Sequence, residues 1–138
     1  APLPRLYPDL QFVVVHTGVP FDRSDEALAV WRAGMKGLAA SPNVVVKISG
    51  LSIPGRPWSV ELQQRVVLDT IEIFGVDRCM FASNFPVDGA VTDFDSLLSN
   101  FDRIVAVLTE DERDRIYYRN AVKYYRPVAA STALSPSR

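Results

Sequence analysis

The sequence contains very few residues of the kinds that form disulfides or bind metals. It has one cysteine, Cys79, and one histidine, His16, among 138 residues. A single cysteine excludes an internal disulfide and a cysteine-based zinc cluster, and it favours a reducing compartment such as the cytoplasm. Because Cys79 lies in an apolar run, we interpret it as a small buried hydrophobic residue and not as a nucleophile.

The chain also lacks an excess of charge of either sign and any long apolar segment. Its 15 Lys and Arg residues nearly balance 16 Asp and Glu residues, which leaves a net charge of -1. This balance gives no electrostatic reason to expect nucleic acid or an anionic membrane as a partner. No apolar run approaches the ~20 residues of a membrane span. We therefore expect a soluble cytoplasmic protein whose partner is a small molecule or another protein. Because the sequence begins with Ala1 and not Met, we also expect it to start inside a longer protein.

Most of the sequence consists of apolar β-branched runs that alternate with amphipathic helical patterns. Strands are predicted at residues 11–18, 43–50 and 78–83, and helices at residues 25–40, 59–74, 94–108 and 109–125. The continuous apolar run of the first strand is typical of a strand that is buried on both faces of a sheet. This alternation predicts parallel strands in an α/β fold, either a doubly wound sheet or part of a (β/α)8 barrel. Three strands are too few to close a barrel, which has about eight.

Helix boundaries are marked by capping residues. Ser24 and Ser59 are predicted N-caps, Gly75 a C-terminal stop, and Thr109 with Glu112 a capping box. We assign residues 1–126 to one domain. The small, polar residues 127–138 show no period, and we predict a flexible tail there.

Polar residues end each predicted strand, where the active sites of parallel α/β proteins lie. His16 could bind a metal, accept a proton or be satisfied by nearby backbone groups, and Lys47 could reach a ligand, a carboxylate or solvent. Asn84 cannot act as a general base and could instead cap an Asx-turn. Asp88 could act as a base, or it could be a solvated loop carboxylate. No sequence motif for nucleotide binding, serine hydrolysis or zinc proteolysis occurs.

Five ordered segments resemble the C-terminal half of the amidohydrolase 2 family. They are PDLQFVVVHTGVP, LAASPNVVVKISGL, PGRPWSVE, IFGVDRCMFASNFPV and LTEDERDRIYYRNAVKYYR. That family comprises predicted TIM-barrel metal-dependent hydrolases, including sugar-lactone and dicarboxylate-lactone hydrolases and, more distantly, a decarboxylase of aminocarboxymuconate semialdehyde. The resemblance implies a partial (β/α)8 TIM barrel of about three C-terminal βα units plus a C-terminal helix.

The resemblance also implies roles for strand-end residues. His16, in the family's H-x-G context, fills the position of a metal-binding or carbonyl-polarising histidine, and Asn84 fills that of the last-strand catalytic Asp. In an intact barrel a divalent metal such as zinc is implied. The family's His-x-His strand is absent from these residues, so we expect the chain alone to be inactive. Asn84 would orient water or substrate, and Asp88 is the candidate replacement base.

Three further residues are candidates for substrate binding. Lys47 and Arg23 could bind a substrate carboxylate, or Arg23 could be a solvated charge near the start of the helix. Trp58 could line the pocket or pack in the interior. The expected parent reaction is hydrolysis of a lactone or of a related ester or amide. The alternatives are a decarboxylase of the same superfamily or a non-catalytic partial barrel. Open strand edges predict that the chain forms a homo-oligomer or pairs with a missing N-terminal barrel half.

Overall fold

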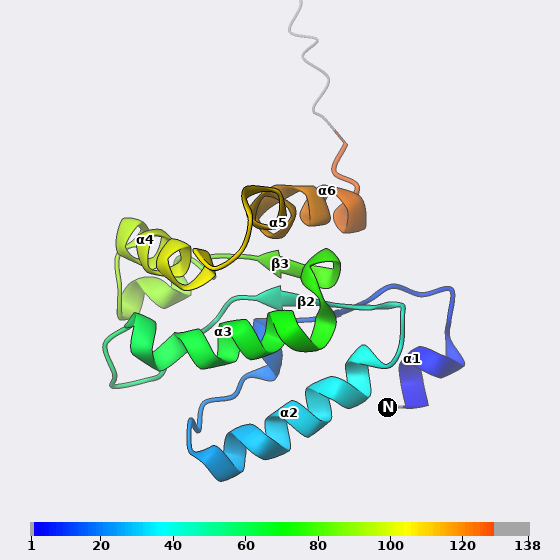
Figure 1. Cartoon of the computed structure of the whole chain (residues 1–138), viewed down its shortest axis with the longest axis horizontal. Coiled ribbons are helices and arrows are strands. Elements are labelled where there is room, and N and C mark those ends of the chain that lie inside the picture. The colour runs from blue at the N-terminus through cyan, green and yellow to red at the C-terminus, as the bar shows by residue number, and fades with distance from the viewer. Residues whose placement is uncertain (1, 129–138) are drawn as a thin grey trace, which may run out of the picture.

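The computed structural model describes residues 2–128, and its centre is a three-stranded parallel sheet (Figure 1). The strands are β1 (Phe12–Val14), β2 (Val44–Ile48) and β3 (Cys79–Phe81), in that order across the sheet. The helices are α1 (Pro2–Leu6), α2 (Asp25–Ala39), α3 (Val60–Phe74), α4 (Phe94–Val105), α5 (Glu110–Asp114) and α6 (Asn120–Tyr125). Short helical turns are η1 (His16–Gly18), η2 (Val76–Arg78), η3 (Val87–Ala90) and the π-helical η4 (Arg115–Arg119), which joins α5 to α6. The predicted α/β class with parallel strands is confirmed.

The predicted helix caps are confirmed and explain where the helices begin. The Ser24 hydroxyl accepts a hydrogen bond from the Ala27 amide, and the Ser59 hydroxyl accepts one from the Leu62 amide. Thr109 and Glu112 form the reciprocal capping box that opens α5. These bonds satisfy backbone donors that have no partner inside the helix. Local sequence therefore sets the start of each major helix.

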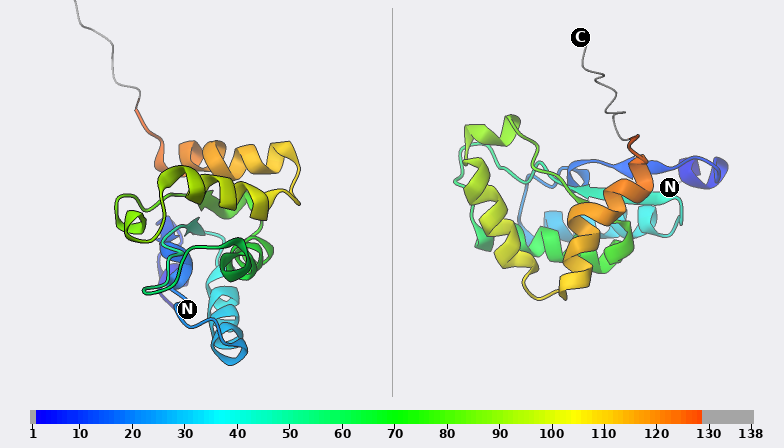
Figure 2. Two further views of the ribbon diagram at one scale, coloured as in Figure 1. Left: turned by 90° about the vertical axis from the view of Figure 1, so that its left-hand side faces the viewer. Right: turned by 90° about the horizontal axis from the view of Figure 1, so that it is seen from above.

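One face of the sheet packs against α2, α3 and α4 to form the hydrophobic core (Figure 2). Alternate residues of β2 point to this face because side chains alternate along a strand. The buried core residues include Val44, Val46, Ile48, Cys79, Val66, Val67, Ile71, Phe74, Phe101 and Ile104. Burial raises the pKa of the Cys79 thiol to about 12, which agrees with its interpretation as a hydrophobic residue.

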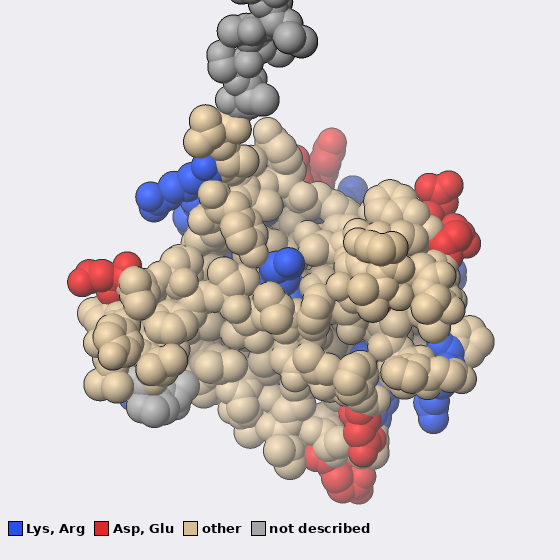
Figure 3. Space-filling model, turned by 180° about the vertical axis from the view of Figure 1, so that it is seen from behind, with Lys and Arg blue, Asp and Glu red and all other residues tan. Residues whose placement is uncertain are grey.

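The other face of the sheet carries the remaining strand residues, Val13, Val45, Lys47 and Met80. Figure 3 shows the surface on this side of the molecule as largely uncharged. In a closed (β/α)8 barrel the corresponding face lines the interior. Among residues 2–128, no helix is long and apolar enough to cross a membrane.

The prediction that the first strand is buried on both faces is wrong. The three residues of β1 are only half-buried, and the next residue, Val15, is 48% exposed. Within the described residues β1 pairs only with β2, so it is an edge strand without a second neighbour. The strand also ends before the predicted boundary, because residues 16–18 form the turn η1. A β-branched run identified the strand and not its position in the sheet.

Other differences are smaller. The helix α1 was not predicted, and α4 ends at Val105, three residues before the expected 108. The last predicted helix, 109–125, contains the π-helical turn η4. Of the predicted tail at 127–138, residues 129–138 lie outside the described residues.

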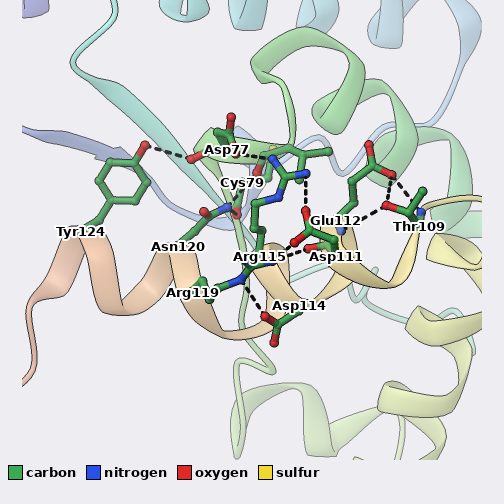
Figure 4. A network of polar contacts seen from close by, with 11 residues as sticks. Asp77, Cys79, Thr109, Asp111, Glu112, Asp114, Arg115, Arg119, Asn120 and Tyr124 are labelled. Atoms are coloured by element: carbon green, nitrogen blue, oxygen red, sulfur yellow. Dashed lines mark hydrogen bonds and ion pairs between the residues drawn. The ribbon is translucent and has the colours of Figure 1, made fainter.

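The C-terminal helices are attached to β3 by buried polar contacts (Figure 4). The Asn120 side chain is 3% exposed, and its Nδ2 donates to the carbonyl oxygens of Val76 at 2.7 Å and Cys79 at 2.8 Å. Arg115 adds an ion pair with Asp77 at 2.7 Å. Asn120 therefore satisfies two carbonyl groups at the beginning of β3, one of them in the interior.

Replacing Asn120 with Ala is expected to lower the free energy of unfolding by roughly 1–3 kcal/mol, because the buried carbonyl group of Cys79 loses the donor that Asn120 provides, whereas the Val76 carbonyl keeps its bond from the Cys79 amide. Urea denaturation followed by circular dichroism measures the loss. Asn100→Ala is the matched control, since Asn100 accepts only one exposed hydrogen bond from Arg103, and it should change the stability by less than about 0.5 kcal/mol. Equal losses in the two variants would contradict this role of Asn120.

Candidate active site

A hollow of about 460 Å³ opens at the carboxyl ends of the three strands. Its walls come from the segments that follow β1, β2 and β3, as expected for a parallel sheet, whose strand ends meet at one edge. The lining residues are His16, Val19, Phe21, Gly50, Ser52, Pro54, Asn84, Val87, Asp88, Ala90 and Val91. The hollow is therefore mostly apolar, with an imidazole, an amide and a carboxylate among its few polar groups.

The His16 side chain is held in place by the residues that end β2. Its Nδ1 lies 2.9 Å from the hydroxyl oxygen of Ser49, whose residue is 2% exposed. A side chain at position 50 would not fit, because a Cβ on Gly50 would lie 2.6 Å from the same Nδ1. The contact with Ser49 occupies Nδ1, so Nε2 is the ring nitrogen left for a ligand.

The backbone around His16 adopts the left-handed conformation at several non-glycine residues. The φ angles are 55° at His16, 51° at Thr17 and 57° at Val19. This conformation is costly, above all for a β-branched residue such as Val19. The indole Nε1 of Trp31 donates to the carbonyl oxygen of Thr17 at 2.7 Å and supports the turn. Tertiary contacts thus maintain an unfavourable backbone at the hollow.

Asn84 and Asp88 form a directly bonded pair. Asn84 Nδ2 donates to Asp88 Oδ1 at 3.0 Å, and the Asp88 amide donates to the Asn84 carbonyl oxygen at 3.2 Å. Asp88 is 3% exposed, and Asn84 has a φ of 58°. Asp88 is therefore not a solvated loop carboxylate. The amide orients a carboxylate that can accept a proton, which the amide itself cannot do.

The remaining three predicted site residues do not line this hollow. Lys47 lies in β2 on the sheet face opposite the helices, and its ammonium group forms no hydrogen bond or ion pair within residues 2–128. Arg23 donates to Gln63 Oε1 at 3.0 Å and to the Leu51 carbonyl oxygen at 3.4 Å. Trp58 is 8% exposed and belongs to the hydrophobic core. The structure thus brings together His16, Asn84 and Asp88.

Ser49 and Gly50 are site residues that the sequence reasoning missed. They are the first two residues after Ile48, the last residue of β2, and they lie two and three positions beyond Lys47. The signal that could have revealed them is the small dipeptide Ser-Gly at a strand end. Such a dipeptide leaves room for a side chain from the neighbouring strand.

The described residues do not fit a catalytic metal by themselves. Within residues 2–128 there is no group of three or more His, Cys, Asp or Glu side chains that could hold an ion. Among the residues that line the hollow, His16 and Asp88 offer one imidazole and one carboxylate. A catalytic zinc site takes about three protein ligands. Any metal at this hollow would need ligands from elsewhere.

Replacing Gly50 with Ala is expected to displace the His16 ring and to lower the free energy of unfolding by about 1–3 kcal/mol, because the φ at position 50 is +57° and the new Cβ would overlap the ring. His16 is the only histidine, so one imidazole NMR signal reports the displacement. Gly34→Ala is the control, since no atom lies within 4 Å of its added Cβ in α2. An unmoved imidazole signal in Gly50→Ala would contradict the tight contact.

Comparison with known proteins places the chain among amidohydrolases. A family model described as amidohydrolase matches residues 1–126. An uncharacterised protein of Sinorhizobium fredii, y4mH, is 40% identical over 124 residues, which cover 90% of this chain and 41% of that protein. An L-fucono-1,5-lactonase of Burkholderia multivorans is 34% identical over 125 residues, covering 82% of this chain and 42% of the lactonase.

The solved structures agree with these sequence matches. An amidohydrolase of Burkholderia multivorans, crystallised with bound zinc, superimposes with a TM-score of 0.84 at 28% identity, and the match covers 91% of this chain and 47% of that chain. A 2,6-dihydroxybenzoate decarboxylase has a TM-score of 0.57 at 19% identity, which shows a shared fold alone. The chain spans less than half of the length of these relatives, so its sheet corresponds to part of their barrel. The chain belongs to the amidohydrolase family.

Proposed function

We propose that this chain supplies the C-terminal part of a (β/α)8 barrel that hydrolyses a lactone or a related ester or amide bond. The observation that carries the proposal is the Asn84–Asp88 pair beside His16 in one hollow at the carboxyl ends of the strands. Similarity to an L-fucono-1,5-lactonase, at 34% identity over a part of that protein, supports the reaction class. It does not specify the substrate.

The three polar residues have complementary roles in such a reaction. Asp88 accepts a proton from the attacking water, whose oxygen bonds to the carbonyl carbon of the substrate. Asn84 holds Asp88 Oδ1 in place, which leaves Oδ2 to meet the water. His16 Nε2 lies on the side of the ring away from Ser49, where it can contact the carbonyl group. When the carbon–oxygen bond of the ring breaks, protonated Asp88 returns its proton to the leaving oxygen.

A divalent metal belongs to the proposal only for the closed barrel. His16 could provide one ligand, and the rest would come from a His-x-His strand in the other part of the barrel. The isolated chain is therefore expected neither to bind metal tightly nor to turn over substrate.

The test is a fusion in which the N-terminal part of the Burkholderia multivorans lactonase precedes this chain. We expect the fusion to bind divalent metal and to hydrolyse at least one member of a panel of sugar lactones, while this chain alone does neither. Metal analysis and a pH-indicator assay of acid release measure the two properties, and circular dichroism confirms that the fusion is folded. A folded, metal-loaded fusion without hydrolase activity would overturn the proposal.

Two substitutions in the active fusion test the roles of the pair. Asp88→Asn should lower kcat at least 100-fold, roughly the contribution of a general base. Asn84→Asp should also lower kcat, because it replaces a donor to Asp88 with a second carboxylate. Asp95→Asn, at an exposed position in α4 outside the hollow, is the matched control and should leave kcat unchanged. Higher activity in Asn84→Asp would show instead that the amide has replaced a base.

Association with another chain is a second proposal, and the exposed apolar surface near the hollow supports it. Within residues 2–128, β1 and β3 each pair only with β2, so each leaves one edge without a strand partner. Val15, Val19 and Phe21, which follow β1, are 48%, 43% and 54% exposed. Open edges and apolar patches favour pairing with a further barrel segment or with a second copy.

For the chain alone we expect a dimer or larger species at micromolar concentration in sedimentation-velocity experiments. The substitution Val15→Lys places a charge beside the open edge and should shift the distribution toward monomer. Val30→Lys, on the solvent side of α2 where the residue is 75% exposed, is the control and should not shift it. A folded monomer at every concentration would contradict self-association.

A further inference from the structure

A second hollow, of about 450 Å³, lies beside the first. Its lining residues are Phe21, Asp22, Arg23, Ser24, Ile53 and Arg56. Phe21 also lines the first hollow, and the consecutive residues Ser52 and Ile53 line the first and the second. The same two loops, which follow β1 and β2, therefore form walls of both hollows.

Arg23 lines this second hollow without a counter-ion. Its NH2 group donates only to neutral oxygens, those of Gln63 and Leu51. Its Nε and NH1 atoms are buried and have no hydrogen-bond partner among the residues that the structure describes. Burial lowers the pKa of the guanidinium to about 10, because removal from water disfavours the charged form. A buried cation normally has an anionic partner, so this arrangement requires an explanation.

No group within residues 2–128 supplies the missing negative charge. Gln63 is fully buried, its oxygen already accepts from Arg23, and its Nε2 is a further donor without a partner. Asp22 is the one acidic residue that lines the hollow, and its Oδ1 accepts from the Ser24 amide at 2.8 Å. Within the described residues Asp22 forms no ion pair with Arg23 or Arg56. The hollow therefore has two guanidinium groups and an excess of donors.

We infer that the second hollow binds a small oxyanion, with Arg23 at its base and Arg56 at its exposed rim. A carboxylate and a phosphate share the required chemistry, since both present oxygen atoms in a geometry that matches a guanidinium group. The sequence predicted that Lys47 and Arg23 bind a carboxylate together. Lys47 lines neither hollow, so Arg56 is the second cation beside Arg23. Because the two hollows adjoin, we regard the oxyanion position as a subsite of the candidate active site. This last step alone rests on the proposed function.

The binding test uses the intact chain and the NMR signal of the Arg23 Nε–H group during titration with sodium acetate and, separately, inorganic phosphate. We expect a saturable shift that is absent with sodium chloride at the same ionic strength and with neutral acetamide. Arg78 is an internal control, because its Nε already donates to the Phe74 carbonyl oxygen at 2.9 Å and should not respond. Tighter binding of acetate identifies a carboxylate ligand, and tighter binding of phosphate identifies a phosphate.

Substitutions complete the test. Arg56→Gln, at an exposed position, should weaken the preferred anion about tenfold or more while leaving the fold intact. In the unsubstituted chain the side-chain amide signal of Gln63, which contacts Arg23, should shift with the same saturation curve, and Arg23→Gln should abolish that shift. Arg5→Gln makes the same charge change in α1, before β1 and away from the strand ends, and should have no effect. Equal responses to chloride and acetate, or equal weakening in Arg5→Gln and Arg56→Gln, would overturn the inference. Neither result depends on hydrolase activity.

Discussion

The parallel pairing of β2 with both of its neighbours is the constraint on which the rest of the structure depends. Val46 is paired with Val14 on one side and with Cys79 on the other, and it is fully buried. This register places the ends of all three strands at one edge of the sheet. His16, Ser49 and Asn84 come from segments more than 30 residues apart, yet each follows its strand at that edge. The pairing of the strands alone therefore brings the segments that line the hollow together.

The strand ends carry backbone conformations that only tertiary contacts make tolerable. His16 and Asn84 both have φ angles near +57°, where most residues other than glycine are disfavoured. Gly50 provides the space that the His16 ring needs, and the Asn84 side chain gains a hydrogen bond to Asp88. Asparagine tolerates this conformation well, so the strain lies mainly at His16 and its neighbours Thr17 and Val19, and such strain is typical of positions at which geometry matters more than stability.

The sequence predicted those features that depend on neighbouring residues along the chain. Ser24, Ser59 and Thr109 cap helices as expected, since a cap is recognised within four residues. It could not predict that β1 is an edge strand within residues 2–128, because an edge strand and a central strand differ only in which other strands pair with them. The sequence also could not show that Arg23 and Lys47, predicted to bind one carboxylate together, lie apart. The fold places Arg23 under the loop after β2 and Lys47 on the sheet face.

The Asn84–Asp88 pair places a carboxylate in the hollow although the residue at the end of β3 carries an amide. Asp88 follows Asn84 by four residues, and the turn between them returns the carboxylate to the hollow. Its burial would be costly without a donor, and the Asn84 amide provides one. An aspartate at position 84 would place two carboxylates within hydrogen-bond distance, where both could not remain ionised without a cation between them. The amide at 84 and the buried carboxylate at 88 are therefore mutually dependent, and neither residue type is explained without the other.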